Sequence, residues 1–276
     1  MSVTPDQSTA AQSTAAQSAA AGGPATATDP GLLDRLQDIA DQVREAATAA
    51  GRPGDSVRLL LATKTIAPPV ILQAIAAGYG LIGENRVQEV VAKADGLTAA
   101  GLPYECHFIG HLQRNKINQV LPHVSCLETV DSIELAERLD AKLAADGRQL
   151  DILVQVNVSG EASKSGLPIS EVPALLAGIA VLPRLRATGY MTIGLNSPDL
   201  DAVRAGYRSL TSFRDDALAR GLPGAEHATE LSMGMSGDFG AAIAEGATIV
   251  RIGSAVFGRR PPINPGTNPD SADPTG

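Results

Sequence analysis

The stretch VRLLLAT (57–63) is an apolar run that is too short for a helix and typical of a buried strand. Near-continuous apolar strands of this kind belong to parallel sheets that are covered on both faces. Seven further runs follow it along the chain: YGLIG (79–83), ECHFIG (105–110), VSCLET (124–129), DILVQVNV (151–158), LRATGYM (185–191), TELSM (229–233) and TIVRIG (248–253).

Helical stretches separate these runs. Pro68-Pro69 opens one of them, and another starts with Asp131 and Glu134 in a capping-box arrangement. Eight strand–helix units in about 200 residues favour the α/β class and a single (β/α)8 TIM-type barrel. An open, doubly wound sheet is the alternative.

Two segments of biased composition flank the alternating pattern. Residues 1–29 consist largely of Ala, Ser, Thr and Gln without Lys or Arg, so they lack the features of a signal peptide. Residues 261–276 are rich in Pro and Gly. We predict that both are disordered tails and that residues 30–260 form one barrel domain.

The composition narrows the classes of function. The formal net charge of −8 argues against a nucleic-acid-binding protein. No apolar run approaches the ~20 residues of a membrane span, so we expect no membrane partner. The two cysteines, Cys106 and Cys126, cannot form a disulfide framework, which favours a reduced, cytoplasmic setting.

The carboxyl ends of the strands carry the active site in a (β/α)8 barrel. The first strand ends in Lys64, and desolvation at an apolar barrel mouth would lower the pKa of its ammonium group. A neutral amine there forms imines with aldehydes. A lysine that snorkels to solvent at a strand end is the alternative for this residue taken alone.

Two turns near the end of the chain are candidates for binding phosphate. The seventh strand runs into a turn that contains Ser236 and Gly237, and the eighth ends at Gly253 and Ser254. Small and hydroxylated residues in such turns expose backbone N–H groups to an anion. The loops after strands 7 and 8 are where this fold most often binds phosphate.

Arg251 lies inside the last apolar run and needs an acceptor if it is buried. An internal salt bridge is the simplest explanation. If the ligand is pyridoxal 5'-phosphate (PLP), the acceptor would be the pyridine nitrogen. A permanent cation there would keep that nitrogen unprotonated and weaken the ring as an electron sink.

Other polar residues are weaker candidates. Glu84 and Asn85 follow the second strand and should face the mouth, where Asn85 would bind a cofactor or cap the next helix. His107 and His111 flank a turn, so we interpret them as structural or pocket-lining residues and predict no metal site. We interpret two methionines as packing residues: Met191 and Met233.

Seven segments, in this order, resemble the pyridoxal-phosphate homeostasis proteins, whose fold is similar to the barrel domain of alanine racemases. They are LLATKT (60–65), IGENRVQE (82–89), HFIGHLQRNK (107–116), VNVSGEASKSGL (156–167), GYMTIG (189–194), LSMGMSGDF (231–239) and VRIGSAVFG (250–258). They span nearly the whole predicted domain.

The resemblance implies that Lys64 carries PLP as a Schiff base and that Arg251 faces the pyridine nitrogen. It also implies that the phosphate is held by Ser236, Gly237, Gly253 and Ser254. Family members often have Thr at the position of Ser254, which keeps the hydroxyl group. They often have an acidic residue at the position of Gly237, which puts a side-chain role there in doubt.

The family is regarded as non-catalytic and as influencing vitamin B6 balance. Alanine racemases add a second domain that supplies a catalytic Tyr, and this chain has only a Pro/Gly-rich segment after its last strand. We therefore expect a monomeric PLP carrier rather than an enzyme, with PLP-dependent apo-enzymes as the implied class of recipient. Lys164, in the loop after the fifth strand, is a hypothetical aid to PLP exchange.

Two alternatives remain at this point. One is a PLP-dependent amino-acid racemase or decarboxylase that acts from the barrel alone. The other is a PLP-free barrel enzyme that binds a sugar phosphate, with Lys64 as a Schiff-base lysine.

Overall fold

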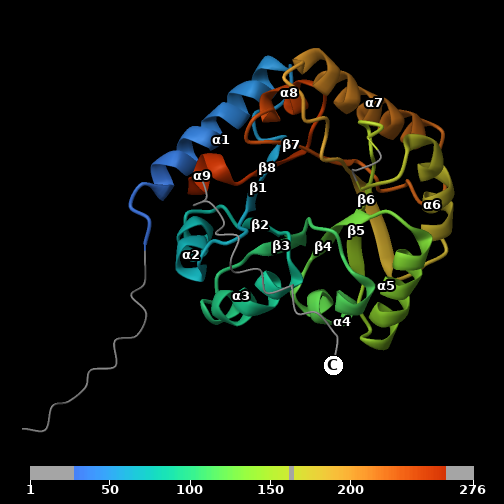
Figure 1. The fold of residues 1–276 in the computed structure, drawn as a ribbon, viewed down its shortest axis with the longest axis horizontal. Helices are drawn as coiled ribbons and strands as arrows, with labels where there is room; N and C mark the ends of the chain where they lie inside the picture. Colours follow the sequence, from blue (N-terminus) through green and yellow to red (C-terminus); the bar gives the residue numbers. More distant parts are fainter. Residues whose placement is uncertain (1–27, 162–164, 259–276) are drawn as a thin grey trace, which may run out of the picture.

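The computed structural model describes residues 28–161 and 165–258. Eight parallel strands close into a barrel in the order of the sequence (Figure 1). The strands are β1 (Arg58–Ala62), β2 (Leu81–Glu84), β3 (Glu105–Phe108), β4 (Cys126–Val130), β5 (Leu150–Gln155), β6 (Leu185–Met191), β7 (Glu230–Met235) and β8 (Ile249–Ile252). The predicted closed barrel is confirmed, and the open sheet is excluded.

Helices form an outer layer around the strands (Figure 1). They are α1 (Leu32–Ala49), α2 (Pro68–Ala76), α3 (Val87–Ala99), α4 (Ile117–Val120), α5 (Ile133–Ala145), α6 (Val172–Ile179), α7 (Leu200–Ala219), α8 (Phe239–Ala244) and α9 (Ser254–Phe257). Three short 3-10 segments accompany them: Arg114–Lys116, Leu121–His123 and Ile169–Glu171. In the described part of the chain, no helix is both long and apolar enough to cross a membrane.

The helix termini follow the local sequence. Pro68 opens α2, as predicted, because the first turn of a helix has no use for the missing N–H. The cap of α5 differs from the prediction by one residue. Ser132, not Asp131, is the N-cap, and its hydroxyl accepts a hydrogen bond from the backbone N–H of Leu135 at 3.3 Å. The predicted tails fall on residues 1–29 and 261–276, which lie almost entirely outside the described residues.

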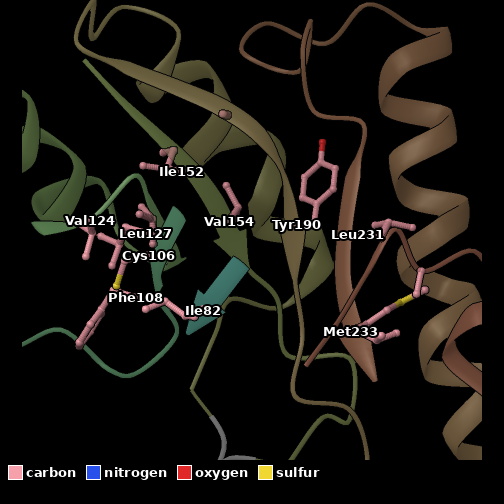
Figure 2. Close-up of a cluster of buried hydrophobic side chains, with 14 of the residues drawn as sticks. Ile82, Cys106, Phe108, Val124, Leu127, Ile152, Val154, Tyr190, Leu231 and Met233 are labelled. Atoms are coloured by element: carbon pink, nitrogen blue, oxygen red, sulfur yellow. The ribbon is translucent and has the colours of Figure 1, made fainter. Parts of the chain in front are cut away.

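Most of the apolar core lies between the strands and the helices. Alternate strand residues point outward and pack there, because successive side chains of a strand point to opposite faces. Figure 2 shows part of this layer, with side chains contributed by β2 to β7 around Tyr190. The aromatic ring of Tyr190 contacts Phe213 of α7 edge-on, with centroids 5.4 Å apart.

The closure of the barrel brings together the two ends of the domain. β1 pairs with β8 in parallel, with Leu60 opposite Arg251 and Leu61 opposite Ile252. Helix α1 precedes β1 and packs against α2, α8 and α9, so it covers the outside of this closure (Figure 1). The first and last strands therefore end side by side at the same mouth of the barrel.

Candidate functional site

A cavity of about 720 Å³ opens at the carboxyl ends of the strands. Pockets of roughly 300–1,000 Å³ are the usual size for small-molecule and cofactor sites. The side chains and backbone that line it come from the ends of β1, β2, β3, β6, β7 and β8: Ala62, Asn85, Ile109, Met191, Ile193, Met235, Ser236, Gly237, Arg251, Gly253 and Ser254.

Six of the seven residues predicted to bind the cofactor line this one cavity. The seventh, Lys64, is half-buried in the turn after β1 and does not itself line it. Ala62, two residues earlier, does. Since side chains of a strand alternate between faces, Lys64 continues the inward-facing series of β1. Lys64 Nζ makes no hydrogen bond or ion pair within residues 28–161 and 165–258.

The turn that presents Lys64 is strained. Thr65 has a φ of 66°, in the left-handed region that β-branched residues rarely adopt. Its backbone N–H donates a hydrogen bond to Glu89 of α3. Strain of this kind persists only where the surroundings over-determine the conformation. The contacts of α3 therefore hold the backbone of Lys64 in place.

A buried lysine, Lys93, links this turn to α3. Its ammonium group donates hydrogen bonds to the backbone oxygen of Thr63 at 2.9 Å, to Glu84 at 2.7 Å and to Glu89 at 2.9 Å. Glu84 also accepts a hydrogen bond from the hydroxyl of Thr63 at 2.6 Å. Burial raises the pKa of Glu84, although Lys93 and Thr63 act in the opposite direction.

These contacts correct one prediction. Glu84 does not face the mouth of the barrel. It points outward to Lys93, between β2 and α3, while Asn85, the next residue, lines the cavity. Neighbouring residues of an extended chain point to opposite sides, so only one of the two can face the mouth. A side chain at Gly110 would collide with the backbone oxygen of Asn85, 2.0 Å from an ideal Cβ, so the glycine permits this close approach.

The turn after β7 is ordered by Asp238. One carboxylate oxygen accepts a hydrogen bond from the backbone N–H of Met235 at 2.7 Å, and the other accepts one from the hydroxyl of Tyr207 at 2.7 Å. The left-handed conformation of Gly234, with a φ of 90°, starts the turn. Ser236 and Gly237 thereby face the cavity.

The two predicted phosphate turns offer unused donors to the cavity. Within the described part of the chain, the backbone N–H groups of Ser236, Gly237, Ser254 and Ala255 make no hydrogen bond. The hydroxyls of both serines are likewise without a partner there. Donors of this kind, collected on one wall, are the surroundings that a phosphate group requires.

Arg251 is buried and projects from β8 into the barrel, 6% exposed. Its guanidinium donates one hydrogen bond to the hydroxyl of Ser232 and one to the backbone oxygen of Thr192, both at 2.8 Å. Only two of the five N–H donors of a guanidinium are thus used by the described residues. Burial lowers the pKa of Arg251, but an arginine stays charged in proteins. A cation with spare donors therefore faces the cavity.

These features fit the chemistry of PLP. The free donors of the two turns suit its phosphate group, and the spare donors of Arg251 suit an acceptor on its ring. Lys64, which is half-buried, follows Ala62 at the end of β1, and Ala62 lines the cavity.

The remaining candidates take separate positions. His107 is buried inside the barrel and contacts Glu128, whereas His111 is exposed in the loop after β3. Both methionines pack as predicted: Met233 lies in the outer core, and Met191 packs in a small cluster with Cys126 and Leu153. Met191 also lines the cavity. Lys164 lies outside the described residues. The sequence did not reveal Asp238 and Tyr207, which order the turn after β7, because their pairing joins segments far apart in the sequence.

The chain is similar to known proteins over most of its length. A family profile described as "Alanine racemase, N-terminal domain" matches residues 35–261. A protein of Pseudomonas aeruginosa named "Pyridoxal phosphate homeostasis protein" is 41% identical over 229 residues, which cover 83% of this chain and 96% of the relative. A protein of the same name from Escherichia coli is also 41% identical, over 83% of this chain and 97% of its own.

One similar protein of known structure is described with a bound ligand. PipY of Synechococcus elongatus, described with PLP bound, superposes with a TM-score of 0.72 at 32% identity. The match covers 82% of this chain and all of PipY.

The contacts of Lys93 generate a stability prediction. Replacing Lys93 with Met should lower the free energy of unfolding by about 3–5 kcal/mol, because it leaves the Glu84 carboxylate buried without a cation. The control Lys142→Met removes the more exposed pair with Asp146 and should cost less than about 1 kcal/mol. Urea unfolding followed by circular dichroism measures both. Equal, small losses would contradict the prediction.

Proposed function

The chain belongs to the family of pyridoxal phosphate homeostasis proteins, and we propose that it holds PLP through Lys64 and passes it on without turning over a substrate. The observation that carries the proposal is the shared cavity. Two turns with unused N–H and hydroxyl donors and a buried arginine with spare donors face the same space, and Lys64 follows the strand that forms its wall.

Each residue has a separate task in this proposal. When bound, PLP supplies an aldehyde that reacts with amines and a ring that withdraws electrons. Lys64 attaches the aldehyde carbon. Ser236 and Ser254 donate their hydroxyls to the phosphate group, beside the backbone N–H groups of Gly237 and Gly253. Asn85, at the end of β2, lines the same cavity and would contact the ring.

Arg251 would meet the ring nitrogen as a donor. Because the guanidinium stays charged, the nitrogen is kept from taking up a proton. An unprotonated ring is a weaker electron sink, which disfavours the proton abstractions on which PLP-dependent enzymes rely.

The lining of the cavity supports a carrier rather than an enzyme. Of the described residues that line it, Arg251 is the only one with an ionisable side chain. A racemase needs a second acid or base on the other face of its substrate. Lys64 alone supplies one group, and the described lining offers no Tyr, His or carboxylate to act as the other.

A carrier needs a recipient, and PLP-dependent apo-enzymes are the class of protein that consumes PLP. We propose that the transfer takes place from a monomer. The buried, unpaired thiols of Cys106 and Cys126 suit a reducing compartment such as the cytoplasm.

Lys64 should be the single point of covalent attachment. Borohydride treatment of the PLP-loaded protein, followed by peptide mass mapping, should label the peptide that contains Lys64. The Lys64→Ala variant should lose the yellow colour and the label. Attachment at another lysine, or a coloured variant with an unchanged spectrum, would sink the assignment.

Removing either hydroxyl should weaken the phosphate contact. Hydrogen bonds to charged groups contribute about 1.5–3 kcal/mol, so Ser236→Ala and Ser254→Ala should each raise the PLP dissociation constant roughly 10- to 150-fold. The control Ser209→Ala, on the outer face of α7, should leave it unchanged. Unchanged constants in both site variants would place the phosphate elsewhere.

Turnover of amino acids should be negligible. Purified, PLP-loaded protein incubated with single enantiomers should leave their chirality intact, as followed by chiral chromatography, and should release no carbon dioxide. Racemisation or decarboxylation that Lys64→Ala abolishes would instead establish the chain as an enzyme.

A further inference from the structure

A network of buried polar side chains crosses the interior of the barrel. Arg251 of β8 donates to the hydroxyl of Ser232 of β7 at 2.8 Å, and that hydroxyl donates to Glu128 of β4 at 2.6 Å. The other oxygen of Glu128 lies 2.7 Å from Nδ1 of His107 of β3. Nε2 of His107 lies 3.7 Å from Glu105, which pairs with Arg58 of β1 at 2.6 Å.

This arrangement is unusual inside a small barrel, where layers of branched apolar residues are the rule. Arg251 and His107 are no more than 6% exposed, and Glu128 and Ser232 are 0% exposed. A buried carboxylate or guanidinium without partners is costly, so the four groups must satisfy one another. Removing the charge of one therefore changes the surroundings of the others.

The end of this network that is remote from Arg251 reaches a second cavity. It has a volume of about 350 Å³ and lies at the amino ends of the strands, opposite the cofactor cavity. His107 lines it, together with charged or titratable side chains from β1, β3, β5, β6, β7 and the segment before β7: Arg58, Glu105, Asp151, Arg186, Glu230 and His227. His107 can thus exchange protons through one mouth of the barrel while Arg251 faces the other.

The charges favour a protonated His107. Although burial opposes its charged form, the nearby carboxylates of Glu105 and Glu128 raise the pKa of His107, and Arg58 opposes them. The pKa of Glu128 is lowered: burial would raise it, but His107, Arg251 and Ser232 outweigh burial. Below the pKa of His107, Glu128 has two cationic neighbours, whereas above it Arg251 alone balances the carboxylate.

We propose that Glu128 and His107 are positioning residues for Arg251, and that protonation of His107 from the amino-terminal cavity strengthens the hold of Arg251 on an anionic ligand with a basic ring nitrogen. The inference rests on the proposed function, because it assumes that such a ligand occupies the cofactor cavity. Reciprocity follows from it: a ligand that binds more tightly to the protonated form must raise the pKa of His107.

The test uses 4-deoxypyridoxine 5'-phosphate, a PLP analogue without the aldehyde, so covalent attachment at Lys64 does not enter. Its dissociation constant is measured by calorimetry from pH 6 to pH 9 for the wild type, His107→Gln and Glu128→Gln. The control His227→Gln removes a titratable imidazole that lines the same amino-terminal cavity but does not belong to the network. Ionisation of the phosphate is common to all four proteins and cancels in their ratios.

The ratio of the His107→Gln constant to the wild-type constant should change by at least about fivefold between the two ends of this pH range, the lower limit of typical coupling between sites. The wild type should gain affinity relative to this variant as the pH falls through the pKa of His107. Glu128→Gln should bind the analogue more tightly than the wild type at pH 9, because the carboxylate that neutralises part of the charge of Arg251 is gone. The ratio for His227→Gln should stay flat.

Two failures are distinguishable. If the wild type does not bind the analogue at any pH, both the proposed function and this inference fall. If it binds and the ratios for His107→Gln and Glu128→Gln are as flat as that of the control, the inference alone is overturned.

A second measurement covers variants that do not fold. The pKa of His107 is followed by NMR in the wild-type protein with and without the analogue. It should rise when the analogue binds, and an unchanged pKa would also overturn the inference.

Discussion

The pairing of β1 with β8 is the contact on which the site depends. Closing the barrel sets Leu60 opposite Arg251 and Leu61 opposite Ile252, so the last strand ends beside the first. Lys64 and Ser254 belong to opposite ends of the domain in sequence, yet both follow this seam at the same mouth. Without closure, the turn that carries Lys64 and the turn that carries Ser254 would not lie side by side.

Closure of the barrel also gives the two faces of each strand different surroundings. The outward faces of the strands form an apolar layer with the helices, and this layer supplies most of the buried apolar surface (Figure 2). The inward faces contribute only small apolar clusters, of which one contains Leu60, Leu81 and Ile249. The stability that the outer layer provides is what permits charged groups such as Arg251 and Glu128 to occupy the interior.

The site is supported from outside the barrel as well as from inside it. Lys93 and Glu89 of α3 hold the strained turn at Thr65, while Asp238 and Tyr207 hold the turn after β7. None of these supporting residues lines the cavity. Supports of this kind hold the backbone of a site in one conformation before a ligand binds.

The sequence by itself determined the number and order of the strands, and it identified the residues at their carboxyl ends. Short apolar runs and their spacing carry that information locally, and each of the eight runs overlaps the strand that the structure shows. For this reason the sequence alone places these residues at one mouth of the barrel: Asn85, Ser236, Gly237, Arg251, Gly253 and Ser254. Their roles toward the cofactor remain predictions.

The tertiary structure alone decided which side chains point inward and which of them meet. Register shifts, as between Leu127 and Val130 of β4, interrupt the simple alternation of faces. Ser232 and Glu128 are 104 residues apart in the chain, and only the closed barrel brings them together. Glu84, likewise, points outward, where it forms an ion pair with Lys93 of α3. Such contacts depend on the relative placement of strands and helices, which no local pattern encodes.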